Sequence, residues 1–220
     1  MVLSTTEENY LKAIFKLSLK GPENISTNNI AAETQTTAAS VSDMLKRLSD
    51  KQLVAYEKYK GVQLTDTGRN IAIELIRSHR LWEVFLVDKL GYKWDEVHVI
   101  AEELEHIKTP DLISRLEVFL GYPTNDPHGD PIPDAEGNIH HHEPISLNEL
   151  QVAEKGIVVR VGEQSVAFLQ YLDRIKLHIG SRVDVLEVNS YDNSRLVRIN
   201  STESVFLSEK VSENLIVKRI

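Results

Sequence analysis

The first 70 residues constrain the fold of this chain more than any other part of it. Apolar residues recur at helical spacing over 5–19, which predicts a first helix. A short helix is predicted around 27–34, and Thr36-Thr37 precedes a third helix whose apolar side chains share one face. Two short strands are predicted at 53–56 and 62–64. Three helices followed by a β-hairpin predict a winged helix-turn-helix.

Helices are predicted to continue through the middle of the chain. A long helix should begin near Thr65-Asp66 and run to about Leu90. Another helix is predicted over 95–107. Thr109-Pro110 is a capping residue followed by a proline suited to the first helical position, and it predicts a further helix that ends near Leu120.

The sequence changes character after residue 121. The span 122–146 contains five prolines and four histidines, and it is predicted to be an irregular connection. Residues 147–220 are rich in strand patterns, interrupted by one helix near 166–176, which predicts a small β-barrel. The predicted strands are Gly156–Val161, Arg182–Val188, Leu196–Ile199, Ser204–Leu207 and Leu215–Arg219.

The predicted fold class is therefore α+β, with three domains. A winged helix-turn-helix is expected over 1–70. A helical domain with the irregular linker is expected over 71–146, and a small β domain over 147–220.

Composition limits the classes of protein to which the chain can belong. The absence of cysteine excludes disulfides, thiolate zinc sites and cysteine nucleophiles. No apolar run approaches the roughly 20 residues that span a bilayer, and the N-terminus does not resemble a secretory signal. We therefore expect a cytoplasmic protein that does not bind membranes. The sequence contains no nucleophile motif and no glycine-rich phosphate loop, so no organic cofactor is predicted.

The charge is distributed unevenly along the chain. The net charge is −8, yet residues 1–70 carry nine Lys and Arg against eight Asp and Glu. Within 44–69 the count is six basic residues against three acidic ones. A locally basic segment can bind nucleic-acid phosphates even on an acidic protein. The rest of the chain carries a net negative charge, which is consistent with another role such as metal binding.

The second and third predicted helices form the helix-turn-helix. Because the second helix of such a motif lies in the major groove of DNA, the third helix of this chain is the candidate recognition helix. Small side chains at its start permit close approach to base edges, and Ser and Thr can donate hydrogen bonds there. Lysine and arginine along this helix and on the hairpin turn would contact phosphates. The candidate DNA-binding residues are Thr37, Ala39, Ser40, Ser42, Asp43, Lys46, Arg47, Lys51, Lys58 and Lys60.

Histidine and carboxylate side chains recur at helical spacing in the middle of the chain. Four of them lie in the helix predicted at 95–107, at offsets of four, seven and eight that place them on one face. Two more lie one turn apart on the preceding long helix. Mixed imidazole and carboxylate ligands suit manganese, iron, cobalt, nickel or zinc, and two ions are plausible. The candidate metal ligands are His79, Glu83, His98, Glu102, Glu105 and His106.

Three other classes of function are consistent with parts of this pattern. The same ligands could serve a metal-dependent hydrolase, which would need an open coordination position and a substrate cleft. A winged-helix regulator could instead respond to an organic effector, with structural histidines. The β-rich tail could bind proline-rich peptides, although it has few aromatic residues.

The sequence resembles the diphtheria-toxin-repressor family of metal-dependent regulators, in particular its manganese-sensing branch. The resemblance covers nearly the whole chain, in family order, and is weakest in the last third. The stretches that carry it are Thr6–Leu11, Ala39–Leu48, Tyr56–Gly61, Leu64–Gly68, Ser78–Glu83, Val97-His98, Glu102–His106 and Pro127–Pro133.

The resemblance implies a winged helix, a helical dimerisation and metal-binding domain, and an SH3-like C-terminal domain. It implies that His79, Glu83 and His98 form an ancillary metal site, completed by Glu163 or Gln164 from the SH3-like domain. It further implies that Glu102, Glu105 and His106 form the primary regulatory site, which usually takes one more ligand at the position of Asn9.

The donor atoms at these positions favour manganese. The iron-sensing branch of the family has cysteine and methionine where this chain has Glu102 and Asn9, and an oxygen-rich site favours Mn²⁺ over softer metals. Fe²⁺ is the alternative, and Zn²⁺ or Co²⁺ could substitute. Manganese-sensing relatives often have aspartate in place of Asn9, and Asp126 stands where the family's loop often has cysteine.

The remaining histidines of the irregular connection are interpreted differently. His140, His141 and His142, with Glu143, are a candidate for an extra metal site, but a solvent-exposed loop is the preferred interpretation. His128 is expected to be a hydrogen-bond partner within a Pro-Gly turn.

The resulting hypothesis is a homodimeric repressor of double-stranded operator DNA that controls genes of metal-ion homeostasis. Metal would neutralise the primary cluster and draw the first helix toward it. This would set the two winged helices of the dimer at the spacing of a palindromic operator.

Overall fold

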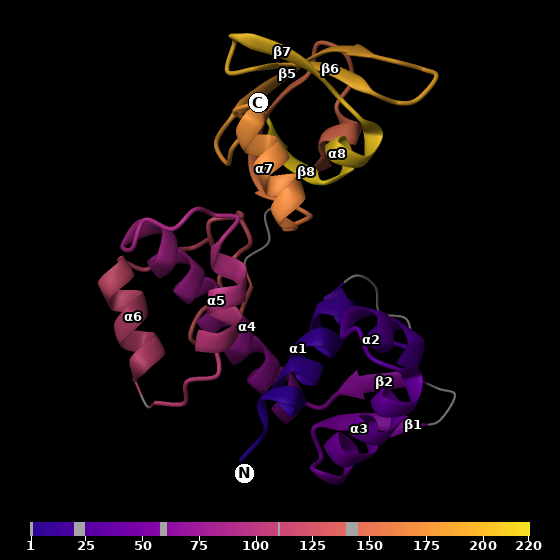
Figure 1. Cartoon of the computed structure of the whole chain (residues 1–220), viewed down its shortest axis with the longest axis vertical. Helices are drawn as coiled ribbons and strands as arrows, with labels where there is room; N and C mark the ends of the chain where they lie inside the picture. Colours follow the sequence, from indigo (N-terminus) through magenta and orange to yellow (C-terminus); the bar gives the residue numbers. More distant parts are fainter. Residues whose placement is uncertain (1, 20–24, 58–60, 110, 140–144) are drawn as a thin grey trace. The chain divides into compact units, whose positions relative to one another are not determined.

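Residues 2–19, 25–57, 61–109, 111–139 and 145–220 are described by the computed structural model, and its N-terminal part forms a winged helix (Figure 1). The winged helix contains α1 (Thr5–Leu19), α2 (Thr27–Glu33), α3 (Ala38–Asp50), β1 (Val54–Glu57) and β2 (Gly61–Leu64). The strands β1 and β2 pair in antiparallel register. The winged helix predicted from the sequence is thereby confirmed.

Capping side chains explain where the two helices of the helix-turn-helix begin. The hydroxyl of Ser26 accepts the backbone N–H of Asn29 at 3.1 Å and caps α2. Thr37 accepts the N–H of Ser40 at 3.2 Å and caps α3. The inward faces of α1, α2 and α3 are apolar, and their fully buried side chains are Leu11, Ile14, Phe15, Ile30, Val41, Leu45 and Leu48.

The long helix α4 (Asp66–Asp88) joins the winged helix through a close backbone contact. The hydroxyl of Thr65 accepts the N–H of Gly68 at 3.2 Å and donates to the carbonyl of Gln52 at 2.9 Å. A Cβ atom at Gly68 would lie 2.0 Å from the carbonyl oxygen of Leu53. Only glycine therefore fits at this crossing.

The next helix, α5 (Val97–Leu104), is shorter than the predicted span 95–107, which was wrong at both ends. After Leu104 the chain turns, with the N–H of Ile107 donating to the Leu104 carbonyl at 3.1 Å. The helix cannot continue far, because the residue before Pro110 is disfavoured in helical conformation. Glu105 and His106 therefore lie in a turn rather than on the helix.

The helix α6 (Leu112–Leu120) begins later than predicted. Its N-cap is Asp111, whose φ of 63° is left-handed and therefore not helical, so a helix start at Thr109-Pro110 was wrong. Pro110 itself lies outside the described residues. Gly121, with a φ of 77°, ends α6 as predicted.

The chain divides into two units. One comprises Met1–His79, Leu104–Pro110 and Pro133–Asn138, and the other comprises Arg80–Glu103, Asp111–Ile132 and Ile139–Ile220. The helix α4 passes from the first unit to the second after His79.

The C-terminal part of the second unit is an antiparallel sheet of β3 (Ile145–Ser146), β4 (Lys155–Val161), β5 (Arg182–Val188), β6 (Arg195–Ile199), β7 (Glu203–Leu207) and β8 (Leu215–Arg219). The strand order is β3-β8-β4-β5-β6-β7, so the described strands form an open sheet with β3 and β7 at its edges. The predicted SH3-like β domain is confirmed, whereas closure into a barrel is not observed.

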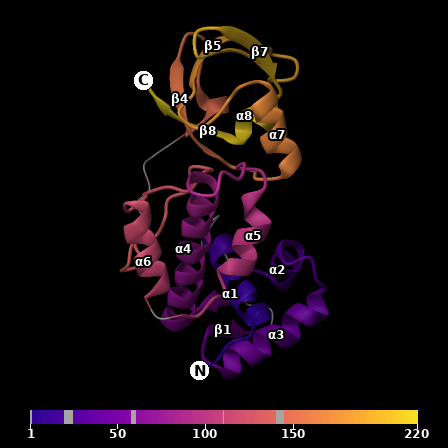
Figure 2. The same cartoon turned by 60° about the vertical axis from the view of Figure 1, so that its left-hand side comes forward.

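Helices and bulges complete this β domain, as Figure 2 shows for α7 (Val166–Arg174) and α8 (Glu209–Glu213) beside the curved strands. The pairing register shifts within β4 and within β5, and such bulges bend a sheet. The buried face of α7 joins the core through Phe168, Leu169 and Leu172. The sequence did not predict β3, α8 or the short 3-10 helix η1 (Leu147–Glu149).

The irregular connection predicted at 122–146 is observed over the part of it that is described. Oδ1 of Asp126 accepts the backbone N–H groups of His128 and Asp130 at 2.8 and 2.9 Å and holds a tight turn. Gly129, with a φ of 87°, packs against β4, where a Cβ atom would lie 2.0 Å from the Val159 carbonyl oxygen. Among the helices of the described residues, none combines the length and apolar character that spanning a bilayer requires.

Candidate metal centres and nucleic-acid interface

His106 lies against α1 in the first unit, with its two ring nitrogens in different environments. Its Nδ1 is 2.6 Å from Oε2 of Glu8, and both side chains are largely buried. The carboxylate therefore accepts the Nδ1–H and leaves the Nε2 lone pair available. Within the described part of the chain, this buried Nε2 has no hydrogen-bond partner. A histidine oriented by a carboxylate through one nitrogen is the usual arrangement of a metal ligand.

Glu105 is the buried carboxylate beside His106. Its Oε2 is 2.7 Å from Nδ1 of His79, and its Oε1 is 2.5 Å from Nζ of Lys12. The Nε2 of His106 is 3.6 Å from the same Oε1. Two of the predicted primary ligands, Glu105 and His106, therefore converge at one point.

Asn9 of α1 contributes a second buried acceptor to this unit. Its Oδ1 is buried and has no hydrogen-bond partner among the residues that the structure describes. A buried amide oxygen without a partner is unfavourable unless a cation or water satisfies it. Asn9 thus offers a buried oxygen in the same unit as Glu105 and His106, and such oxygen and imidazole donors suit a hard divalent cation.

In the second unit, Glu83 lies between two histidines. Its side chain is 1% exposed, with Oε1 3.6 Å from Nδ1 of His98 and Oε2 3.4 Å from Nδ1 of His128. His98 is more open and also lies 3.8 Å from Glu102, one turn further along α5. His98 therefore contacts Glu83, its expected partner in the ancillary site, and also Glu102, which was expected in the primary site.

Glu83, Asp126 and His128 form a fully buried cluster of candidate ligands in the second unit. One ligand atom from each lies within 4.8 Å of the others. Nε2–H of His128 donates to the carbonyl oxygen of Trp94 at 2.8 Å, so Nδ1 is the ring nitrogen that faces Glu83. No described residue hydrogen-bonds to this Nδ1. The three side chains therefore offer two oxygens and one nitrogen to a cation.

Burial and mutual charge perturb the acidities in this cluster. Burial, reinforced by the carboxylates of Asp130 and Glu83, raises the pKa of Asp126 to about 7. Burial alone would lower the pKa of His128, but the Glu83 carboxylate outweighs it and raises that pKa to about 9. Protons therefore occupy these groups near neutral pH, and a bound metal would displace them.

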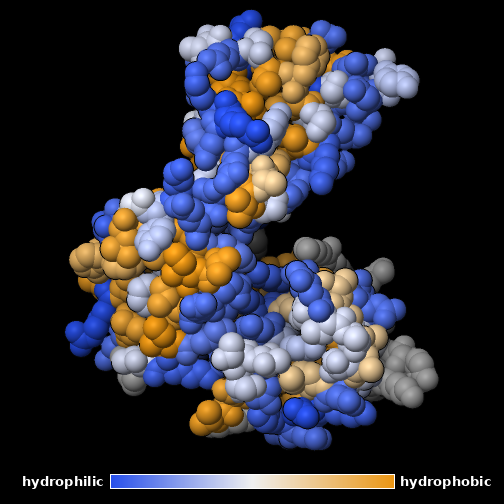
Figure 3. Space-filling model, viewed as in Figure 1, coloured by the Kyte–Doolittle hydropathy of each residue, from blue (hydrophilic) through white to orange (hydrophobic). Residues whose placement is uncertain are grey.

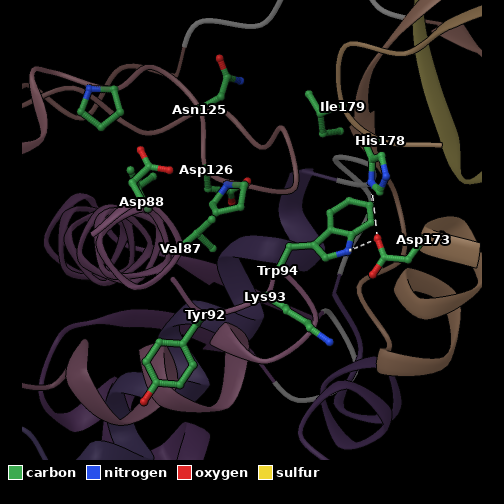
Figure 4. A pocket seen from close by; sticks show the side chains of 13 residues that line it. Val87, Asp88, Tyr92, Lys93, Trp94, Asn125, Asp126, Asp173, His178 and Ile179 are labelled. Carbon is green, nitrogen blue, oxygen red and sulfur yellow. Dashed lines mark hydrogen bonds and ion pairs between the residues drawn. The ribbon is translucent and has the colours of Figure 1, made fainter. Parts of the chain in front are cut away.

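Asp126 connects the cluster to a surface pocket of about 600 Å³ (Figure 4). Asp88 and Asp173 contribute further carboxylates to its lining. On one side, Nε1 of Trp94 donates to Asp173 at 3.0 Å, and Nδ1 of His178 is 3.4 Å from the same Oδ1. The pocket thus brings three carboxylates, those of Asp88, Asp126 and Asp173, together with the ammonium group of Lys93.

Glu163 and Gln164, the ligands expected from the β domain, have other partners. Glu163 accepts the hydroxyl of Ser165 at 2.6 Å, at the start of α7. The amide of Gln164 donates to Asp130 at 2.8 Å. Among the described residues, Glu163 belongs to no group of three His, Asp or Glu side chains whose ligand atoms lie within 4.8 Å of one another.

Four residues of these clusters were not predicted as site residues from the sequence: Glu8, Lys12, Asp126 and His128. The hydrogen bond expected of His128 is present, but its burial beside Glu83 could not be read from a Pro-Gly turn. Glu8 is one of two adjacent glutamates, and no periodicity distinguishes it from Glu7. The occurrence of Asp126 where related sequences often have cysteine was the one available signal.

The candidate recognition helix presents its predicted contact residues to solvent. Thr37, Ala39, Ser40, Asp43, Lys46 and Arg47 are exposed, and Ser42 is half-buried. Val41, Leu45 and Leu48 face the core instead. Lys58 and Lys60, expected on the hairpin turn, lie outside the described residues.

Lys51 connects the end of this helix to α1. Its Nζ is 2.5 Å from Oε1 of Glu7, and its side chain is 33% exposed. The ammonium of Lys51 is the main cause of a lowered pKa at Glu7. Glu7 and Glu8 are adjacent, so one turn of α1 contacts both the recognition helix and His106.

Fold and site together define a winged-helix protein with carboxylate and histidine clusters suited to divalent metal. Three family models match the chain. Residues 2–62 match the N-terminal DNA-binding domain of iron dependent repressors, and residues 65–134 match their metal binding and dimerisation domain. Residues 145–219 match the FeoA domain.

Curated relatives are similar to the chain over different lengths of sequence. The iron-dependent repressor IdeR of Mycobacterium bovis is 36% identical over 131 residues, which cover 60% of this chain and 56% of that protein. The chain thus spans little more than half the length of this relative. The diphtheria toxin repressor of Corynebacterium diphtheriae is 28% identical over 196 residues, covering 84% of this chain and 86% of that protein.

A solved structure resembles nearly the whole chain. It is described as a manganese-dependent transcriptional repressor in complex with manganese, and it is 33% identical with a TM-score of 0.88. The similarity covers 97% of this chain and 100% of that one. The chain therefore belongs to the diphtheria-toxin-repressor family of metal-dependent regulators. The relatives named here are repressors rather than enzymes, so the hydrolase alternative is not supported.

Proposed function

We propose that this chain is a manganese-dependent, DNA-binding transcriptional repressor that acts as a homodimer and controls metal-ion homeostasis genes. In this proposal residues 1–70 bind DNA, residues 71–146 bind metal and dimerise, and residues 147–220 form an SH3-like accessory domain. The chain's membership in a family of metal-dependent regulators supports DNA binding and repression under the control of a divalent metal.

The observation that carries the proposal is the pair of buried, unsatisfied ligand atoms in the first unit. Oδ1 of Asn9 and Nε2 of His106 lack hydrogen-bond partners among the described residues, and they belong to two of the predicted primary ligands. With Glu105 they are the primary-centre ligands of the first unit, and the family resemblance adds Glu102 as a further oxygen donor. A divalent cation held there would supply the positive charge that neutralises these carboxylates.

The donor chemistry favours manganese over softer metals. Carboxylate and amide oxygens with one imidazole suit Mn²⁺, whereas sulfur ligands are absent from the whole set. Iron is the alternative, because several relatives are named iron-dependent repressors. Zn²⁺ and Co²⁺ are also expected to bind, since affinity for divalent metals rises from manganese toward copper.

We place the second centre at Glu83, with Asp126 and His128 as its partners. This set is supported by its complete burial and by the Trp94 carbonyl, which holds Nε2 of His128 and leaves Nδ1 facing Glu83. The alternative set is His79, Glu83 and His98, with Glu163, as the family resemblance implies. Glu83 belongs to both sets, so replacement of the other residues distinguishes them.

Residues of α1 offer a path from the primary centre to the recognition helix. Glu8 holds His106 by its Nδ1–H, while the adjacent Glu7 holds Lys51 at the end of α3. A shift of α1 that accompanies filling of the primary centre would therefore also move Lys51. Exposed Thr37, Ala39 and Ser40 would then meet base edges, with Lys46 and Arg47 on phosphates.

Dimerisation is supported by exposed apolar side chains on the helical part of the second unit. Figure 3 shows such side chains gathered over α5 and α6. They include Val99, Val118, Phe119 and Tyr122, each at least 57% exposed. An exposed apolar patch on a soluble domain marks an interaction site, and the family model that matches residues 65–134 describes a dimerisation domain.

The proposal is tested by measuring DNA binding against several metals. Duplexes are first selected from a random library with Mn²⁺-loaded protein, and affinity is then measured by fluorescence anisotropy with Mn²⁺, Fe²⁺, Zn²⁺ or chelator. We expect Mn²⁺ to tighten DNA binding strongly and chelator to abolish this effect. Activation by Fe²⁺ alone would favour the iron-dependent alternative, and binding that ignores every metal would refute the proposal.

A further inference from the structure

Lys12 places an ammonium group at the carboxylate of the primary centre. Its Nζ lies 2.5 Å from Oε1 of Glu105, and the two side chains are only 6% and 0% exposed. The residues are 93 positions apart, so this is a tertiary contact between α1 and the turn after α5. A lysine–glutamate pair buried to this extent is uncommon, because burying both charges is costly.

The ammonium group and an incoming metal need the same part of Glu105. Oε2 of this carboxylate is held by Nδ1 of His79 at 2.7 Å, while Oε1 contacts Lys12 and lies 3.6 Å from Nε2 of His106. Lys12 therefore stands at the oxygen where the Glu105 and His106 ligands converge. A cation bound to that oxygen must displace the ammonium group or bind beside it.

We propose that Lys12 is an internal cation that competes with divalent metal for Glu105 and so raises the metal concentration at which the primary centre fills. This inference rests on the proposed function, since it takes Glu105 as a metal ligand.

The charge of Lys12 has opposite consequences for folding and for metal binding. A buried carboxylate without a counter-charge destabilises a protein, so Lys12 allows Glu105 to be buried before metal arrives. The same charge repels a second cation in an interior that screens it weakly. Removal of the charge should therefore lower the stability of the metal-free protein while it raises the affinity for metal.

The test compares the full chain with Lys12→Met, which keeps an unbranched side chain without the charge. Protein stripped with chelator is titrated with Mn²⁺ by calorimetry, and the primary centre is identified as the site lost in Glu105→Gln. We expect the Kd of that site to fall at least about tenfold in Lys12→Met. The Tm without metal should fall, and the rise in Tm caused by Mn²⁺ should increase.

Two further variants keep the test decisive. Lys176→Met removes the lysine of an exposed pair with Glu203 in the β domain, and it should leave the Kd unchanged. Lys12→Arg retains the charge and binds a carboxylate more firmly, so it should weaken Mn²⁺ binding at least about threefold. If Lys12→Met does not fold, the direction in which Lys12→Arg changes the Kd for Mn²⁺ decides whether Lys12 competes with the metal.

The outcomes separate this inference from the function on which it rests. Absence of any Mn²⁺ site that Glu105→Gln abolishes would refute the proposed function. The competition would be overturned if the Kd of the primary site did not fall in Lys12→Met. It would also be overturned if that Kd did not rise in Lys12→Arg. In either case Lys12 would be a structural residue.

Discussion

Metal binding at the second centre should release protons, and the number released follows from the acidities of Asp126 and His128. With a pKa of about 9, His128 is almost fully protonated at pH 7, and with a pKa of about 7, Asp126 is half protonated. Both must lose their protons to act as ligands. Filling this centre at pH 7 should therefore release about one and a half protons, counted from these two pKa values.

The same two acidities set the pH dependence of the metal affinity. Between pH 6 and pH 8, deprotonation of His128 becomes about a hundredfold easier and that of Asp126 about tenfold easier. The affinity of the second centre for Mn²⁺ should therefore rise by about a thousandfold over this range. Each tenfold step corresponds to about 1.4 kcal/mol of binding free energy.

Calorimetry in buffers of different ionisation enthalpy measures both quantities. A His106→Ala background removes the primary centre, and Lys108 still holds Glu8 there. In that background Asp126→Asn should reduce the proton release to about one and the pH effect to about a hundredfold. Unchanged Mn²⁺ binding in Asp126→Asn and in His128→Gln would refute the assignment and favour His79, Glu83 and His98 as the second centre.

Three further predictions concern the winged helix and its connection to the primary centre. Gly68→Ala should lower the free energy of unfolding by about 3 kcal/mol, because its Cβ would lie 2.0 Å from a backbone carbonyl, and a loss under about 0.5 kcal/mol in urea unfolding would contradict this. Glu8→Gln should weaken Mn²⁺ binding by about tenfold to a hundredfold through misorientation of His106, measured by calorimetry; unaltered affinity with an intact fold would show that Glu8 does not position this ligand. The Lys51 ammonium lowers the pKa of Glu7 below its usual value of 4.5. The stability that this lowered pKa contributes is fully present above pH 4.5, and it is lost as the pH falls through the pKa of Glu7 in the folded protein. Lys51→Met should therefore cost about 1 kcal/mol at pH 7 and little at pH 2, and an equal loss at both pH values in denaturant titrations would count against this account.

Local sequence signals predicted most of the elements accurately. The bounds of α1, β5 and β8 were predicted to the residue, because apolar periodicity and turn residues agree there. Errors occurred where backbone conformation departs from a common cap pattern. The left-handed Asp111 delays α6, although Thr109-Pro110 is a typical helix start.

The candidate metal residues were predictable to different degrees. Helical spacing identified His79, Glu83, His98 and Glu102, because they lie on α4 and α5. Glu105 and His106 were predicted for the same reason, although they lie in the turn that follows α5. Local spacing cannot identify Glu8 or Lys12, since their partners are 98 and 93 residues away.

Asp126 and His128 illustrate a different limit of sequence reasoning. A loop rich in proline and glycine is typically exposed, and nothing in its pattern predicts burial. The turn is buried because Asp126 binds two of its backbone N–H groups and Gly129 packs closely on β4. The positions of both side chains are therefore set by tertiary packing.

The central claim is that metal at Glu105 and His106 controls the binding of DNA by the winged helix. Its most direct test is the anisotropy of a selected, labelled duplex titrated with the wild-type chain and with His106→Ala, each with Mn²⁺ and with chelator. We predict that Mn²⁺ tightens DNA binding by the wild type at least about a hundredfold, which is about 2.7 kcal/mol of coupling, and that His106→Ala loses this effect while it remains folded. Equal DNA affinity of the wild type with Mn²⁺ and with chelator would contradict the claim.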